Sequence, residues 1–411
     1  MITILCSGSR GDFQPYIALA QELQKLGKTV RIAGGKSFED FIKNYSIDFY
    51  PLSADYQSAE IDPKLLQDAQ SSDNPLKMIL TFNKMKKYVI GLTAEMFAAC
   101  QGSELIVYHP GCTIGYFAGT KLGIPAILAA PFPMHKTTEV ASLIAYGKTI
   151  MPKAVSYKLL QGMLWMAGKT GIEAFFKKEY GKLPEDFGSP FEKIDQAHPA
   201  IISCSNFVFP RPHDWNANIH QNGYWFVTEK DDYTPAKELA DFLADGEKPV
   251  YFGFGSVFDS THQVETVAII IEALRRTGKR GIISGMGAID NLPKNLLAID
   301  SIPHSWLFER VSLVCHHGGA GTTAAGFKAG IPSIIVPFSN DQFAWAHRSY
   351  DLGVGAKPIY RKHLTADKLA AALQYALTDA IITNARNLGY NIGTENGARA
   401  GAKIIANYLE R

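Results

Sequence analysis

The 411-residue sequence has few cysteines, and none of them are arranged as a pair. Cys6, Cys100, Cys112, Cys204 and Cys315 are odd in number, widely spaced and in no C-x-x-C motif. A disulfide framework and a structural zinc site are therefore not expected, and a reducing compartment fits better.

Long hydrophobic runs are also missing. No segment approaches the roughly 18–20 apolar residues that cross a bilayer. The opening MITILCSGSRGD lacks the charged start and the long apolar stretch of a secretory signal. We therefore expect a soluble, cytoplasmic protein with no transmembrane segment, and we leave open a peripheral contact with a membrane.

The net charge is small as well. The 41 basic and 39 acidic side chains leave +2, which gives no global field to attract nucleic acid, so no nucleic-acid partner is expected. An anionic ligand would have to be held by local geometry. The content of 46% hydrophobic and 19% charged residues is that of a folded globular protein. The length exceeds the roughly 250–300 residues of a single core, so two or three domains are expected.

The sequence does contain short apolar runs that alternate with helical stretches. The strand expected at Ile2–Leu5 is followed by a glycine-rich turn, a helix that ends near Gly27 and a second strand at Val30–Ala33. Such a unit places the two strands parallel. Further strands are expected at Leu105–Tyr108, Ala126–Ala129, Ile201–Ser203, Val250–Phe254, Gly281–Ser284, Leu313–Cys315 and Ser333–Val336. The alternation predicts an α/β protein with two doubly wound parallel sheets.

Residues 228–248 are the most charge-rich segment, and we place a domain linker there. A surface helix within a single unit is the alternative. Residues 76–99 and 141–179 are expected to be helices that pack in the core. Their apolar side chains favour an apolar pocket in the first half of the chain. The expected domains are residues 1–227 and 249–394, and Ile404, Ile405 and Tyr408 lie at helical spacing in a final segment, 395–411.

The second half contains a strand that leads into a glycine-rich turn and then a helix, CHHGGAGTT at 315–323. Glycines let backbone N–H groups point outward, and the first turn of a helix adds unpaired donors and a partial positive charge. Together they can seat a phosphate, although such turns also occur without a ligand. The turn is neither a P-loop nor G-x-G-x-x-G. The groups that would contact the phosphate are the backbone N–H groups at Gly318, Gly319 and Gly321, the hydroxyls of Thr322 and Thr323, and the ring of His317.

Asp341 and Gln342 follow the next strand and would lie at the same edge of the sheet. An acid beside an amide offers the acceptors and donors that sugar hydroxyls need. An ordinary turn-forming aspartate is the alternative.

Two stretches resemble one enzyme family. PHSWLFERVSLVCHHGGAGTTAAGFKAGIPSIIVPFSNDQFAWAHR resembles the donor-binding signature of GT-B glycosyltransferases of family 1, the UDP-glycosyltransferase superfamily. It is most similar to that of sterol glucosyltransferases and of bacterial macrolide and glycopeptide glycosyltransferases. GSRGDFQPYIALA resembles the N-terminal signature of the same subgroup. The resemblance implies two Rossmann-like domains facing a cleft, an acceptor domain at 1–227 and a nucleotide-sugar domain at 249–394. It also implies that the helix at 395–411 returns to the N-terminal domain and helps to govern closure of the cleft.

The resemblance also implies roles for individual residues. Asp12 falls at the position of the general base, and His317 at that of a pyrophosphate contact. The other donor-binding positions implied are Ser9, Arg10, Gly255, Ser256, Gly319, Ala320, Gly321, Thr322, Asp341 and Gln342. Phe132 and His135 begin a loop expected over the acceptor.

The sequence departs from the pattern of the plant relatives in two places. The tryptophan that stacks on the base before Pro-Gln is missing from Ser301–His304, so Trp306 is left as a wall and uridine versus thymidine stays open. His109 stands where those relatives have an aspartate. It could orient Asp12, but a packed histidine is the favoured interpretation.

The activity that follows is that of an inverting glycosyltransferase without a cofactor or metal, since no DxD-type pair occurs in a suitable loop. It would move a hexose, expected to be glucose, from UDP-glucose or a dTDP-sugar to a hydroxyl of a large apolar acceptor. Sterols, terpenoids, flavonoids and macrolides all fit that description. A GT-B UDP-sugar epimerase or hydrolase, and a non-catalytic nucleotide-sugar or lipid binder, are the alternatives.

Overall fold

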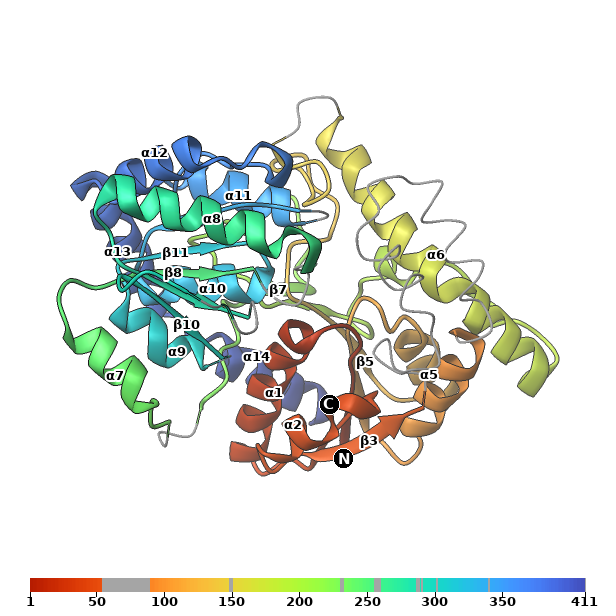
Figure 1. Ribbon diagram of the computed structural model, residues 1–411. Helices are drawn as coiled ribbons and strands as arrows, with labels where there is room; N and C mark the ends of the chain where they lie inside the picture. The colour runs from red at the N-terminus through yellow and green to blue at the C-terminus, as the bar shows by residue number, and fades with distance from the viewer. Residues whose placement is uncertain are drawn as a thin grey trace. The chain divides into compact units, whose positions relative to one another are not determined.

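The computed structural model describes residues 1–53, 89–147, 151–229, 233–254, 260–285, 289, 291–300, 302–338 and 341–410. The chain divides into two compact units (Figure 1). The first contains Met1–Thr228 together with Glu395–Arg411, and the second contains Glu229–Thr394.

The first unit is built on a parallel sheet of seven strands in the order β3-β2-β1-β4-β5-β6-β7. Central strands such as β1 and β4 are buried along their whole length, as expected for a parallel sheet covered on both faces. The strands are β1 (Ile2–Leu5), β2 (Val30–Gly35), β3 (Asp48–Leu52), β4 (Leu105–Tyr108), β5 (Ala126–Ala130), β6 (Ala200–Ile202) and β7 (Ile219–Gln221).

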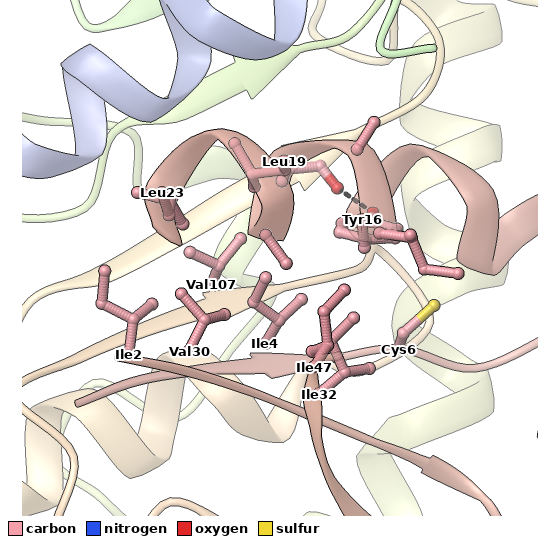
Figure 2. Packing of buried hydrophobic residues seen from close by; sticks show 14 of the residues in the cluster. Ile2, Ile4, Cys6, Tyr16, Leu19, Leu23, Val30, Ile32, Ile47 and Val107 are labelled. Atoms are coloured by element: carbon pink, nitrogen blue, oxygen red, sulfur yellow. Dashed lines mark hydrogen bonds between the residues drawn. The ribbon is translucent and has the colours of Figure 1, made fainter. Parts of the chain in front are cut away.

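Helices α1 and α14 cover the sheet of the first unit near β1. Their packing joins the two ends of the chain, because Ala402 and Ile405 of α14 are fully buried in the same core as Ile4 and Leu23. Figure 2 shows this core between β1, β2, β4 and α1. The helices of the unit are α1 (Arg10–Lys25), α2 (Glu39–Lys43), residues 89–99, α5 (Ile114–Leu122), α6 (Lys153–Tyr180) and α14 (Gly397–Leu409), with short 3-10 turns at Lys36–Phe38 and Pro190–Glu192.

The second unit repeats the plan with five parallel strands in the order β10-β9-β8-β11-β12. The strands are β8 (Val250–Gly253), β9 (Gly281–Ser284), β10 (Leu296–Ile299), β11 (Leu313–His316) and β12 (Ser333–Ile335). The helices are α7 (Lys237–Ala244), α8 (Ser260–Thr277), α9 (His304–Leu307), α10 (Ala320–Ala329), α11 (Gln342–Asp351), α12 (Ala366–Ala376) and α13 (Asp379–Gly393), with 3-10 turns at Phe308–Arg310 and Arg361–His363.

The structure confirms the two parallel α/β sheets and contains every strand predicted from the sequence. It adds β3, β7 and β10. Residues 141–147 were expected to be helical, but they form turns ahead of α6. In these turns the N–H of Ala145 donates to the carbonyl oxygen of Ser142, three residues earlier. The expected helix at 76–99 is described only from residue 89 onward. Among the described residues, no helix is both long and apolar enough to cross a bilayer.

Part of the charge-rich segment expected to be a linker lies inside the second unit. Residues 237–244 form α7, and Leu239 is buried with Tyr251 and Leu307 in a side cluster of that unit. The boundary between the units falls between Thr228 and Glu229, and the chain returns to the first unit at Glu395.

Candidate functional site

The glycine-rich turn of the second unit joins β11 to α10. Gly318 has a φ of +95°, in the left-handed region that favours glycine. A Cβ atom there would lie 2.7 Å from Cγ2 of Ile335 and 3.1 Å from the carbonyl oxygen of Gln342. The turn is therefore pressed against the start of α11, and only glycine fits at this position.

His316, the last residue of β11, fixes the turn from below. Its Nδ1 accepts the N–H of Gly318 at 3.1 Å, and the residue is fully buried. Burial, together with the nearby His317 and His304, holds its pKa well below the usual value, so the ring is neutral at neutral pH. Its Nε2 has no hydrogen-bond partner among the residues that the structure describes.

His317 lies at the mouth of the same turn and is half-buried. Burial lowers the pKa of His317, and the backbone of Gly253, the last residue of β8, acts against that shift. Its Nδ1 is buried, and within the described part of the chain no group pairs with it. A buried ring nitrogen without a partner is costly unless a ligand or water satisfies it.

The helix that follows begins without a side-chain cap of its own. Gly319 is the N-cap residue of α10, and glycine has no side chain that could accept the first N–H groups. The N–H and the hydroxyl of Thr323 both donate to the carbonyl oxygen of Gly319, each at 2.9 Å, and so close the first turn. The N–H groups of Ala320, Gly321 and Thr322 precede that closure, at the helix end where the dipole favours negative charge.

Asp341 and Gln342 lie beside this turn and are held by neighbours in their own loop. The indole N–H of Trp345 donates to Oδ2 of Asp341 at 2.9 Å, and the Phe338 N–H donates to Oε1 of Gln342 at 2.8 Å. The contact between Gly318 and the backbone of Gln342 joins the loop to the glycine turn. The structure thus brings together the two motifs that the sequence placed at one sheet edge.

The turn after β1 in the first unit is built around the Asp12 carboxylate. Ser9, the N-cap residue of α1, donates its N–H at 2.6 Å and its hydroxyl at 2.9 Å to Oδ2 of Asp12. Gly8 has a φ of +126°, and a Cβ atom there would lie only 2.3 Å from the same Oδ2. Any residue other than glycine at position 8 would therefore clash with the Asp12 carboxylate where the structure places it.

His109 follows β4, the strand next to β1. Its N–H donates to the Leu5 carbonyl at 2.9 Å, and its Nδ1 accepts the N–H of Gly111 at 3.0 Å. A neutral His109 consequently has its proton on Nε2. Burial lowers the pKa of His109, and the negative charge of Asp12 acts against that shift.

The sequence did not single out Gly8, His316 or the backbone bonds of His109. A common pattern was available: His109-Pro110-Gly111 and His316-His317-Gly318 share the spacing H-x-G at the end of a buried strand. In both cases Nδ1 of the histidine accepts the glycine N–H.

Several expected site residues have other partners in the structure. Both donors of Ser9 are used by Asp12. The guanidinium of Arg10 lies 4.5 Å from the ring centre of Phe41. The guanidinium of Arg310 lies 4.3 Å from the indole of Trp306, so one face of the expected base-stacking wall is covered.

The two expected acceptor contacts differ from each other. Phe132 is half-buried, whereas His135 is 3% exposed and packs edge-on against Trp215, whose indole N–H donates to the His135 carbonyl. Burial lowers the pKa of His135 to about 4. These contacts fit a core histidine better than an acceptor contact. Gly255 and Ser256 lie outside the described residues.

The two ends of the chain match two family models. Residues 2–140 match the glycosyltransferase family 28 N-terminal domain, and residues 283–407 match the erythromycin biosynthesis protein CIII-like C-terminal domain. A sterol 3-beta-glucosyltransferase of Arabidopsis thaliana is 31% identical over 426 residues, which covers 99% of this chain and 68% of the plant protein. The chain belongs to the GT-B glycosyltransferases of family 1. It is a glycosyltransferase.

Solved structures of this superfamily have the same fold. The glycosyltransferase of kitacinnamycin superimposes with a TM-score of 0.73 at 20% identity, covering 99% of this chain and 98% of the other. The glycosyltransferase VinC, solved with dTDP, gives a TM-score of 0.69 at 16% identity over 100% and 99% of the two chains. Fungal sterol 3-beta-glucosyltransferases, such as that of Penicillium rubens, are much longer: this family member covers 30% of that protein.

Proposed function

We propose that this glycosyltransferase moves a hexose, expected to be glucose, from a nucleoside diphosphate sugar to the hydroxyl of a sterol or a similar large apolar acceptor, with inversion at the anomeric carbon. The acceptor class rests on the similarity to sterol 3-beta-glucosyltransferases along 99% of this chain. The observation that carries the chemistry is the Asp12 carboxylate, around which the turn after β1 is built.

Asp12 is the group we assign as general base. Both bonds from Ser9 reach Oδ2, which leaves Oδ1 as the oxygen to take the proton of the acceptor hydroxyl. The acceptor oxygen then forms a bond to the anomeric carbon while the bond from that carbon to the phosphate oxygen breaks. The electron pair leaves with the diphosphate. A single displacement of this kind converts an α-linked donor into a β-glycoside.

The leaving diphosphate gains its stabilisation, in this proposal, from the start of α10. Peptide N–H groups fixed before the reaction stabilise developing negative charge without having to reorganise. The place of His317 supports the same assignment: a Cβ atom on Gly319, the N-cap residue of α10, would lie 2.6 Å from its Nε2, so a protonated ring could donate to a phosphate oxygen at this helix end. Asp341 and Gln342, beside the turn, are assigned to the hexose hydroxyls.

The nucleoside is less specified than the phosphates. Arg310 over Trp306 leaves that indole one face at most for stacking. The dTDP in the VinC structure supports a thymidine donor, and the sterol glucosyltransferase relatives support glucose as the sugar.

The test is a reaction of UDP-glucose or dTDP-glucose with a detergent-solubilised sterol, followed by mass spectrometry of the products. A sterol hexoside together with released nucleoside diphosphate is the expected result. Free glucose or an epimerised donor in the absence of acceptor would instead indicate the epimerase or hydrolase. Donor binding without turnover over a broad set of hydrophobic alcohols would favour the non-catalytic binder.

A further inference from the structure

Helix α6 of the first unit is apolar on more than one side. Its inner side is buried: Tyr157, Leu160 and Ile172 are all less than 9% exposed. Trp165 and Phe176 pack against Phe117 of α5. That face alone accounts for how α6 is held in the unit. A helix of a globular protein ordinarily presents polar residues on the opposite side.

The outer side of α6 is apolar instead. Val155, Leu159 and Met166 are 49%, 47% and 58% exposed. Their spacings of four and seven residues place them along one line on the helix surface. Exposed apolar side chains aligned in this way mark an interaction surface more often than scattered ones do. We call these three residues the outer stripe.

The charged side chains that α6 itself places beside the outer stripe have one sign. Lys158 and Lys169 each lie three residues beyond an apolar member of the stripe, and both are exposed. From residue 151 to 172 the chain has three lysines and no aspartate or glutamate, and the first acidic residue of α6 is Glu173. Apolar side chains bordered by lysines match the boundary between the acyl chains and the head groups of an anionic bilayer.

Two copies of this surface would fit each other poorly. A symmetric pair would bring the lysines of one stripe towards those of the other, and no acidic side chain in the first five turns would neutralise them. An anionic lipid surface complements both the charge and the apolar side chains.

We propose that the outer stripe of α6 docks the first unit on an anionic lipid bilayer, with Val155, Leu159 and Met166 in the interface and Lys158 and Lys169 at the phosphates. The inference does not depend on the proposed reaction. If the acceptor is a sterol, it explains how the enzyme reaches a substrate that resides in membranes.

The test is co-sedimentation of the full chain with phosphatidylcholine vesicles containing phosphatidylglycerol, compared with phosphatidylcholine alone. We expect binding to the anionic vesicles that falls as salt increases. Leu159→Gln with Met166→Gln should lower the partition coefficient about tenfold. Lys158→Gln with Lys169→Gln should lower it roughly 30-fold on anionic vesicles only.

The matched control removes two exposed apolar side chains from the second unit, Val264→Gln with Tyr390→Gln, which are 80% and 76% exposed. This control should bind like the parent protein, and circular dichroism should show that all variants are folded. The proposal is overturned if the parent protein does not bind anionic vesicles, or if stripe and control variants bind alike. It is also overturned if the stripe variants turn a lipid-free dimer into monomers in sedimentation velocity, since the stripe would then join two copies.

Discussion

Helices α1 and α10 each follow a turn containing a left-handed glycine after a buried parallel strand, yet their N-termini are filled differently. The start of α1 carries its own anion, because Asp12 accepts both donors of its N-cap residue, Ser9. The N-cap residue of α10 is Gly319, which supplies no side chain. Both ends attract negative charge. One unit uses that attraction to hold a carboxylate in place, and we propose that the other uses it to bind the diphosphate of the donor.

Two histidines at the ends of buried strands, His109 after β4 and His316 in β11, show a related contrast. Nδ1 of His109 and Nδ1 of His316 accept the N–H of the glycine two residues later, at 3.0 and 3.1 Å. Burial lowers the pKa of both. The Asp12 charge opposes the shift for His109, whereas neighbouring histidines reinforce it for His316. The same hydrogen bond therefore holds one histidine near the negative charge of Asp12 and the other next to further histidines.

The largest effect is expected from removing the negative charge of Asp12 at the start of α1. Asp12→Asn keeps the size of the side chain and should lower kcat by about 10²–10⁴, the usual contribution of a positioned base. Calorimetric titration should show donor affinity changed by no more than about twofold, because the anion seat is in α10. Asp379→Asn, at the first turn of α13, is the control and should leave kcat unchanged. A fully active Asp12→Asn enzyme contradicts the assignment.

The second change introduces a carboxylate at the N-cap position of α10, as α1 already has one in its first turn. Gly319→Asp and Gly319→Asn meet the same steric contact, since a Cβ atom there lies 2.6 Å from Nε2 of His317. Their difference therefore isolates charge. The aspartate variant should bind the donor about 10–100-fold more weakly than the asparagine variant. Equal affinities, measured by calorimetry, would mean that no phosphate sits at this helix end.

The third change displaces Asp12 without altering it. Gly8→Ala places a methyl group where the carboxylate oxygen lies and strains a φ of +126°. We expect kcat to fall about tenfold and the free energy of unfolding to fall by about 1–3 kcal/mol. Gly27→Ala is the control: it also has a positive φ, but no atom lies within 4 Å of its Cβ position. It should lose stability in urea unfolding while keeping kcat.

The smallest expected effect is a pH dependence of donor binding. Burial lowers the pKa of His317 in the free enzyme, so the ring is neutral there at neutral pH. A bound phosphate favours the protonated ring and raises that pKa. Affinity for UDP-glucose should therefore increase a few-fold as the pH falls from above the pKa of the complex towards that of the free enzyme. In His317→Ala the affinity should no longer depend on pH in this range. If it still does, the pH dependence arises from another group.

The sequence was sufficient for the strands that are buried on both faces, because continuous apolar runs such as Leu105–Tyr108 have few other uses. It was insufficient for β3, an edge strand that contains Pro51, a residue normally taken as evidence against a strand. It was also wrong for residues 141–147, where apolar residues fold into turns rather than a helix.

The candidate site shows the same limit at finer scale. The glycine turn and the Asp341–Gln342 loop could be predicted to lie together, because adjacent parallel strands end at one sheet edge. Ser9 and Asp12 have the S-x-x-D spacing of a capping box, so the bond from the Ser9 N–H to the Asp12 carboxylate could have been predicted from the sequence. The second bond, from the Ser9 hydroxyl, and the close approach of the carboxylate to Gly8 could not. Likewise, the packing of His135 against Trp215 joins residues distant in sequence.

The configuration of the product tests the central assignment most directly. The enzyme would be supplied with an α-linked nucleoside diphosphate glucose and a sterol, and the new glycosidic bond examined by proton NMR. Direct displacement by an acceptor oxygen, deprotonated at Asp12, predicts a β-glucoside. An α-glucoside would mean that the anomeric carbon is not inverted in a single step, and would contradict the role given to Asp12.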